Sequence, residues 1–574
     1  MLFISLVALI GACADQVTED TSKKKSNEIV KSAADLILSG GDIVTIDEAQ
    51  PNVEAVAIKD GKILGLGALK EVNAQFKGDK TQLIDLAGKT LMPSFIDAHS
   101  HYFNGLLVSG QAQVYAPPSG GGKDIPSILN SIKEFADQNK IGKGELIMAY
   151  GYDDTVMPDG RLLNRDDLDA AFPDNPVRVD HVSMHGAVMN SKAHEKYGYD
   201  ASTVAPPGGV IVRKPGTNEP FGLIMESAFL KAFEQTEPMS EAEEIEASKA
   251  AQKLYAENGI TTAHEGATHL SQYKTMKRVA DNGTNFIDII AFPFITDVDK
   301  VLAITPQDKW LKYENRLKIG GVKITIDGSP QGRTARFTTP YLQGGPAGEE
   351  NWKGQLTFLQ PMVNAMVDKV YKMAVPLNLH ANGDGAIDAF FEAHRAAAGD
   401  NLTQARDVTM IHAQFARPDQ LDVFVDYKIR PSFYSLHTYY FAEAHRANRG
   451  EQQTAYISPM RDAIDKGLRP TNHTDFVVAP LDQMMMLWSA VNRISRDGKI
   501  IGKGQRIEVL EGLKAMTIWP AEQYNEADRK GSLSLGKLAD MVILSANPLT
   551  VPIAEINKIK VMETFKEGIS IYKR

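Results

Sequence analysis

The chain of 574 residues contains 62 Lys and Arg residues against 72 Asp and Glu residues, which gives a formal net charge of −10. Charges of both signs are mixed along the sequence and no basic block exceeds three residues, which excludes a nucleic-acid-binding function. A hydrophobic content of 43% excludes a disordered chain and predicts a large core in more than one domain. Cys13 is the single cysteine, so no intramolecular disulfide forms.

The N-terminal segment ends at this cysteine. Residues 2–12 are apolar or small throughout, a run too short for the ~20 apolar residues of a membrane span. Ile10-Gly11-Ala12 before Cys13 is similar to the cleavage and lipidation signal of bacterial lipoproteins, although no Lys or Arg precedes the apolar run. We expect residues 1–13 to be a lipoprotein-type signal segment and residues 14–33 to be a flexible tether, with a buried N-terminal helix as the alternative. The predicted location is the periplasm or cell envelope, with Cys13 as the lipidation site and no other contact with the membrane.

Short strand-like runs, separated by turn residues, occupy both ends of the chain beyond the tether. They begin at Ala34, where Gly-Gly and Asp-Gly pairs break them, and the C-terminal part repeats the pattern in residues 531–544 and 561–565. We therefore predict that residues 34–92 and 526–574 together form one small β-sandwich domain.

Between Pro93 and Pro520, strand-like apolar runs alternate with helical stretches, a pattern typical of βα units. The eight predicted strands cover residues 95–98, 259–263, 286–291, 321–326, 375–379, 408–411, 429–433 and 468–471. Eight such units predict an α/β fold of the (β/α)8 TIM barrel type, which takes roughly 250 residues. We assign residues 93–525 to the barrel domain, and residues 105–257, which are too many for a loop, to a subdomain inserted after the first strand.

Residues able to bind a metal recur at the carboxyl ends of these strands, where barrels carry their active sites. His99 and His101 follow the first strand at a spacing of two, which points both side chains to the same face. His380 ends the fifth strand, His412 ends the sixth, and Asp475 follows the eighth. Each of these would be unremarkable alone, as a buried core histidine or a helix cap. Their shared place at one rim of one barrel predicts a metal site.

Lys323 stands between Val322 and Ile324 in an otherwise apolar strand, where a buried ammonium group would cost on the order of several kcal/mol. One interpretation is that its amine reaches the rim or pairs with Asp327 on the same face of the strand. The other is that carbon dioxide carboxylates the amine, which gives an anionic carbamate able to bridge two cations. These residues by themselves leave both interpretations open.

The candidate ligands stand in longer motifs, which are Pro93–His101, Val322–Ala335, Leu379–Asp384 and the closing Gly536–Leu544. Further similarity lies in Asn164–Ala171, His185 and Asn190-Ser191. With these motifs the chain resembles the amidohydrolase superfamily, and within it the YtcJ-like branch. The resemblance extends from about Ala34 to the end of the chain.

The resemblance implies a hydrolase site with two divalent metal ions, and zinc is the first choice because imidazoles and carboxylates suit it. The implied ligands are His99, His101 and Asp475 on one ion, His380 and His412 on the other, and carboxylated Lys323 as the bridge. Metal-activated hydroxide would attack the substrate, and Asp475 would pass the proton to the leaving nitrogen. The substrate carbonyl would be polarised by a metal ion or by a donor such as His185 or Arg333.

Two features depart from the family pattern. His473 stands where relatives usually have glycine, so its imidazole either shapes the substrate pocket or caps a loop. Residues 432–440 are aromatic enough to line a pocket for an apolar or ring-bearing substrate, or to pack against the insertion. The candidate substrate-binding residues are therefore His185, Asp327, Arg333, His437 and His473, and His264 is a further candidate at the pocket.

The predicted function is metal-dependent hydrolysis of non-peptide carbon–nitrogen bonds in a small amide, cyclic amide or N-substituted formamide. A lactone or ester hydrolase, or a deaminase, would use the same site. An exported solute-binding lipoprotein with an inactive barrel is the alternative of a different class. The expected partner is a small-molecule substrate, and a homodimer is left open. Manganese, iron and cobalt also accept His and carboxylate ligands, so the identity of the metal stays open.

Overall fold

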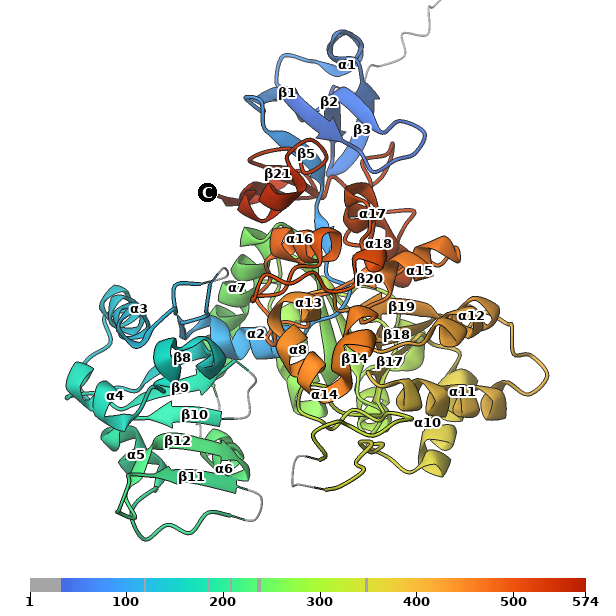
Figure 1. The fold of residues 1–574 in the computed structure, drawn as a ribbon. Coiled ribbons are helices and arrows are strands. Elements are labelled where there is room, and N and C mark those ends of the chain that lie inside the picture. The colour runs from blue at the N-terminus through green and yellow to red at the C-terminus, as the bar shows by residue number, and fades with distance from the viewer. Residues whose placement is uncertain (1–32, 118–119, 183–185, 207–208, 235–238, 346–348) are drawn as a thin grey trace, which may run out of the picture.

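The computed structural model describes residues 33–574, except for residues 118–119, 183–185, 207–208, 235–238 and 346–348. The predicted signal segment, with the lipidation site Cys13, lies outside the described residues. In the described part of the chain, no helix combines the length and the apolar character that a bilayer crossing requires. Helices alternate with parallel and antiparallel strands, so the predicted α/β class is confirmed (Figure 1).

An eight-stranded sheet brings the two ends of the chain together. Its order is β23-β22-β21-β5-β1-β2-β3, with β4 paired to β1. Its strands are β1 (Leu36–Val44), β2 (Asn52–Lys59), β3 (Lys62–Gly67), β4 (Gln82–Asp85), β5 (Thr90–Pro93), β21 (Met541–Leu544), β22 (Val561–Lys566) and β23 (Ile569–Lys573), and α1 (Leu69–Phe76) accompanies them. Antiparallel pairing of Met541 with Pro93 fixes the C-terminal segment beside the strand that leads into the central part. The division into domains stays a prediction.

The central part is built on parallel strands in two sheets, with the orders β15-β14-β13-β6 and β16-β17-β18-β19-β20. The first sheet contains β6 (Phe95–Ile96), β13 (Ile260–Thr268), β14 (Asp288–Pro293) and β15 (Leu317–Ile319). The second contains β16 (Val322–Thr325), β17 (Leu377–Ala381), β18 (Val408–His412), β19 (Arg430–Phe433) and β20 (Thr471–Asn472). An isolated parallel bridge between Phe294 and Lys323 joins the two sheets. Each of the eight predicted strands overlaps one of these strands.

Gly321 separates β15 from β16 and lets the chain pass close to β17. Its φ is +151°, and a Cβ atom there would lie 2.2 Å from the carbonyl oxygen of Pro376, so a side chain does not fit. The strands that follow are buried on both faces, as parallel strands between helices are. Val322 and Ile324 of β16, with Leu377 and Leu379 of β17, belong to the main hydrophobic core.

Helices follow the central strands and lie outside them, with α10, α11 and α12 beside β17 and β18 (Figure 1). They are α7 (Glu241–Glu257), α8 (Leu270–Asp281), α9 (Val298–Leu302), α10 (Gln360–Met373), α11 (Asp384–Ala398), α12 (Pro418–Tyr427), α13 (His437–Tyr440), α14 (Ala442–Ala455), α15 (Met460–Asp465), α16 (Gln483–Asn492), α17 (Val509–Lys514) and α18 (Ile518–Gln523). The spacing of apolar residues decides which face each helix buries. In α10, for example, Val363, Val367 and Val370 recur on one face and are fully buried.

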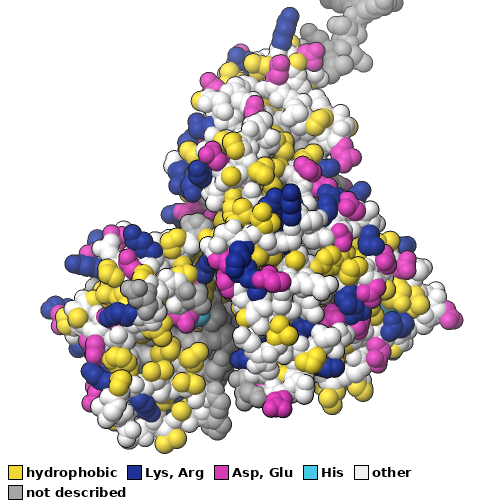
Figure 2. Space-filling model, in the orientation of Figure 1, with side chains coloured by type: hydrophobic (Ala, Val, Ile, Leu, Met, Phe, Trp, Pro, Cys, Tyr) yellow, Lys and Arg dark blue, Asp and Glu magenta, His cyan; other side chains and the backbone are white. Residues whose placement is uncertain are grey.

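The chain between α2 (Tyr102–Ser109) and α7 forms a lobe beside the central part (Figures 1 and 2). Its sheet has the order β11-β12-β10-β9-β8-β7. The strands are β7 (Ala112–Gln113), β8 (Ile147–Tyr152), β9 (Val177–His181), β10 (Gly186–Met189), β11 (Gly209–Arg213) and β12 (Pro220–Glu226); the helices are α3 (Ile125–Gln138), α4 (Arg165–Ala171), α5 (Ser191–Tyr197) and α6 (Ser227–Glu234). Contacts that join the lobe to the central part include a hydrogen bond from the Tyr150 hydroxyl to the Val477 carbonyl at 2.7 Å and an ion pair of Arg496 with Asp153 at 2.9 Å.

Candidate metal centre

Three of the predicted ligands lie on adjacent parallel strands. Lys323 is in β16, His380 is in β17 and His412 ends β18. Thr325 pairs with His380, and Ala381 pairs with His412, so the two histidines stand at neighbouring strand ends. Their rings meet there, with Nδ1 of His380 3.1 Å from Nε2 of His412.

The other three predicted ligands follow β6 and β20. The backbone N–H of Asp475 donates to the carbonyl of His99 at 3.2 Å, which joins the two loops. Oδ1 of Asp475 lies 3.4 Å from Nε2 of His99 and 3.4 Å from Nε2 of His101. Nζ of Lys323 is 3.3 Å from Nε2 of His99. These contacts, with the shared strand ends, bring all six predicted ligands together in one cluster.

Burial determines the charge of these groups. His99 and His412 are buried, and burial lowers the pKa of each imidazole well below its usual range, so both rings are neutral. Burial also lowers the pKa of Lys323 to about 7. Burial alone would raise the pKa of Asp475, but the contact with the His101 imidazole helps to hold it well below its usual range. Neutral imidazoles and an ionised carboxylate are the forms that bind a cation.

The unpartnered atoms of the cluster fit a divalent cation. Oδ1 of Asp475 is buried and accepts no hydrogen bond, a state that is costly for a charged oxygen without a cation beside it. His99, His412 and Asp475 each offer one ligand atom, and these atoms all lie within 4.8 Å of one another. Two imidazole nitrogens and a carboxylate oxygen are a donor set that zinc accepts. Because this group draws on both predicted ligand sets, the division of ligands between two ions stays a prediction.

Asp327 supports the cluster and makes no pair with Lys323. Its carboxylate accepts hydrogen bonds from three backbone N–H groups, including those of Asn382 and Gly383, at 2.9 to 3.0 Å. Its Oδ1 lies 3.4 Å from Nε2 of His380. Asp327 therefore holds the loop after β17 and faces a predicted ligand. Lys323 is only 1% exposed, so its amine does not reach solvent at the rim either.

Besides Asp327, two of the candidate substrate-binding residues lie in the layer around the cluster. Nε2 of His473 is 3.0 Å from Nδ1 of His412, so His473 contacts a predicted ligand directly. His437 lies one step further out. Its ring centroid is 4.4 Å from that of Tyr434, which in turn packs 5.2 Å from the His473 ring.

The remaining candidates are not placed at the cluster. The Arg333 guanidinium donates to the carbonyl of Gln343 at 3.3 Å, within the loop that follows β16. His185 lies outside the described residues. The expectation that either one polarises a substrate carbonyl therefore stays a prediction.

Glu265, in β13, also faces the cluster, and the sequence reasoning missed it. Its carboxylate accepts a hydrogen bond from the backbone N–H of Phe103 at 2.6 Å, and its backbone forms a bridge with His101. Burial raises the pKa of this carboxyl group. The neighbouring His264 packs its ring 4.9 Å from that of His99. The signal was present, because His264 and Glu265 directly follow the second predicted strand.

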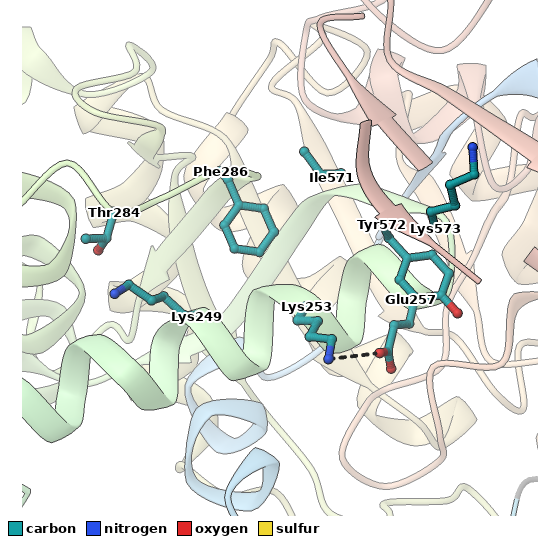
Figure 3. Close-up of a pocket in the computed structure, with 8 residues that line it drawn as sticks. All are labelled: Lys249, Lys253, Glu257, Thr284, Phe286, Ile571, Tyr572 and Lys573. Atoms are coloured by element: carbon teal, nitrogen blue, oxygen red, sulfur yellow. Dashed lines mark ion pairs between the residues drawn. The ribbon is translucent and has the colours of Figure 1, made fainter. Parts of the chain in front are cut away.

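A separate pocket of about 580 Å³ lies between α7 and β23 (Figure 3). It is lined by Lys249, Lys253, Glu257, Thr284, Phe286, Ile571, Tyr572 and Lys573. Its three lysines are each paired with a glutamate, as Lys253 is with Glu257 at 3.8 Å. The pocket shares no residue with the candidate metal centre.

Residues 82–572 match the model of the amidohydrolase family. The chain belongs to this family. It is 26% identical to the putative amidohydrolase YtcJ of Bacillus subtilis, over 94% of this chain and 99% of that protein. It is 22% identical to the N-substituted formamide deformylase of Arthrobacter pascens, over 94% of this chain and 98% of that protein. The fold is similar to that of an uncharacterized metal-dependent hydrolase from Pyrococcus horikoshii, with a TM-score of 0.69, 23% identity, and coverage of 90% of this chain and 99% of that one. The resemblance to the YtcJ-like branch is thus confirmed.

Proposed function

We propose that this amidohydrolase is a metal-dependent hydrolase of carbon–nitrogen bonds other than peptide bonds. One observation carries the proposal: the neutral imidazoles of His99 and His412 lie beside the ionised carboxylate of Asp475, whose Oδ1 is buried without a hydrogen-bond partner. That arrangement is unfavourable for the protein alone and favourable for a cation site. The substrate class is a small amide, cyclic amide or N-substituted formamide, which the name of the relative from Arthrobacter pascens supports.

The proposed ligand set holds two divalent ions, with zinc as the first choice. The proposed ligands are His99, His101, His380, His412 and Asp475, with carboxylated Lys323 between the ions. A bound divalent ion lowers the pKa of water from about 15.7 to about 7 and polarises a carbonyl group. Carboxylation requires a neutral amine, and burial, which lowers the pKa of Lys323 to about 7, supplies that form under mildly alkaline conditions.

Asp475 carries the proton in this proposal. Its carboxylate is ionised and lies at the centre of the cluster, 3.4 Å from two imidazoles. Its carboxylate takes up a proton from the attacking water at the oxygen that does not face the cation and returns it to the leaving nitrogen, so one group acts first as base and then as acid. Burial of the surrounding rings excludes bulk water, which strengthens each electrostatic contact at the reaction centre.

We infer further that the two parallel sheets are the halves of a (β/α)8 TIM barrel in residues 93–525. The bridge between Phe294 and Lys323 supports one junction, and the hydrogen bond from Asp475 to His99 supports the other. Residues 105–257 are the proposed inserted subdomain. Residues 34–92 and 526–574 are the proposed β-sandwich domain.

The same site chemistry would also serve a lactone, an ester or a deamination substrate. An exported solute-binding lipoprotein is the alternative of another class, and it predicts a site that binds no metal. Lipidation at Cys13, a periplasmic or cell-envelope location and a homodimer remain proposals that rest on the sequence pattern alone.

The deciding experiment combines metal analysis with a substrate panel. Zinc-loaded protein is assayed on N-phenylformamide, dihydrouracil and γ-butyrolactone, and zinc content is measured before and after loading. His99→Ala and Asp475→Ala are expected to abolish turnover while the circular dichroism spectrum is kept. His394→Ala is the matched control, because His394 is buried and hydrogen-bonded to Tyr371 outside the cluster. Unchanged turnover in the two cluster variants, or less than ~0.5 zinc equivalents in the loaded wild type, would refute the proposal.

A further inference from the structure

His473 departs from the family pattern, and its imidazole lies at a defined place beside the candidate metal centre. The residue follows β20, two positions before Asp475, and is 1% exposed. Nε2 of His473 is 3.0 Å from Nδ1 of His412, and Nδ1 of His473 is 3.0 Å from Oγ of Ser432. The ring thus links a predicted ligand on β18 to a buried hydroxyl on β19.

The hydrogen bonds couple the proton positions of the two rings. Nε2 of His412 faces Nδ1 of His380, at the point where the ligand atoms converge. If Nε2 is to present a lone pair there, the ring proton of His412 must sit on Nδ1, because a neutral imidazole carries one proton. Nδ1–H then donates to Nε2 of His473, which must be unprotonated. The proton of His473 consequently sits on Nδ1 and is donated to Oγ of Ser432.

The opposite arrangement of the ring protons would prevent His412 from binding a cation. If His473 donated from Nε2, then Nδ1 of His412 would be the acceptor and the His412 proton would move to Nε2. That proton would point at His380 and occupy the position of a cation. The hydroxyl of Ser432 accommodates the first arrangement by accepting from Nδ1 of His473, and a cation at Nε2 of His412 selects that arrangement. Packing prevents the ring from turning away, because the centroid of His473 is 5.0 Å from His412 and 5.3 Å from His99.

We propose that His473 is a positioning residue that holds His412 in the orientation and tautomer in which Nε2 binds a divalent cation. The inference rests on the proposed function, because the cation is the one proposed above. It assigns His473 to the metal site and removes it from the residues that contact substrate. Partners of this kind typically contribute roughly 10- to 100-fold to metal affinity.

The test is the zinc affinity of metal-free protein, measured by competition with a chromophoric chelator. His473→Phe keeps a ring of similar volume and removes both nitrogens, and is expected to weaken zinc binding by roughly 10- to 100-fold. His473→Gln places an amide oxygen within reach of Nδ1 of His412 and is expected to restore most of the affinity. Ser432→Ala removes the far acceptor and is expected to give a smaller loss in the same direction.

His394→Phe is the matched control, because it also removes a buried and hydrogen-bonded imidazole, 2.7 Å from the Tyr371 hydroxyl. It is expected to lower the midpoint of thermal unfolding without changing zinc affinity. If His473→Phe does not fold, the zinc affinity of Ser432→Ala still decides the question, because the inference predicts a loss there. Normal wild-type binding together with unchanged affinity in Ser432→Ala, and in His473→Phe where it folds, would overturn this inference alone. A wild type that binds no zinc would overturn the proposed function and the inference with it.

Discussion

Asp288 holds together the base of the central part, and its replacement by Asn should destabilise the whole protein. The carboxylate of this residue in β14 contacts Nζ of Lys530 at 2.5 Å, Nζ of Lys566 at 2.7 Å and the Arg316 guanidinium at 3.0 Å. Asp288, Lys530 and Lys566 are almost fully buried, and Arg316 is partly buried. The contacts join the first parallel sheet to the C-terminal strands, so the network also supports the frame that carries the metal centre.

The size of the destabilisation follows from the charges that remain around position 288 in the variant. In the wild type, Lys530 also contacts Glu526 at 2.8 Å, and Lys566 also contacts Asp540 at 2.7 Å. Asp288→Asn keeps the shape of the side chain but removes one negative charge, so one buried positive charge is left uncompensated. Removal of one partner from a buried ion pair costs about 3–5 kcal/mol in the free energy of unfolding. The matched control is Asp281→Asn, which breaks an exposed pair with Lys277 and should cost below about 0.5 kcal/mol.

The difference in the free energy of unfolding between wild type and Asp288→Asn should decrease as the pH falls. Burial would raise the pKa of Asp288, but the facing Lys530 and Lys566 lower it far below the value of about 3.9 in an unfolded chain. The ionised carboxylate therefore stabilises the native state above pH about 4, and this contribution is lost as the pH falls further. Urea unfolding followed by circular dichroism at pH 7 and pH 3 measures both effects. A difference between wild type and Asp288→Asn below about 1 kcal/mol at pH 7, or one that does not narrow at pH 3, would refute the reasoning.

Two further predictions concern the site. Tyr150→Phe removes the hydroxyl that bonds to Val477, two residues after Asp475, and is expected to destabilise the junction between lobe and central part by about 1 kcal/mol. Hydrogen exchange at the amides of β8 should rise and kcat/KM should fall, and unchanged exchange would contradict this. Lys323→Met should bind less zinc than wild type and lose any gain in zinc content on addition of bicarbonate, as measured by metal analysis. A variant that retains the wild-type zinc content and bicarbonate response would rule out a carbamate bridge.

The sequence alone predicted the features that depend on local pattern. Each predicted strand of the central part overlaps an observed one, because a run of apolar residues between turn and helix signals is a local property. The pair His99 and His101 was recognisable for the same reason, since a spacing of two on an extended chain puts both rings on one face. The place of His380 and His412 at their strand ends also follows from local pattern, and with it the prediction that the ligands meet at one rim.

The tertiary structure decided which residues touch across long separations in the chain. His412 meets His473 across 61 residues, and Lys323 meets His99 across 224 residues. Such contacts depend on strand register and on how the loops after β6 and β20 join. Neither can be predicted from the local pattern of residues along the sequence. Asp327 is a second example. Its spacing from Lys323 suggested an ion pair between the two side chains, but in the structure the Asp327 carboxylate accepts hydrogen bonds from three backbone N–H groups. The residue types determined what chemistry the cluster can perform. The packing of the chain determined which side chains contact and orient one another within it.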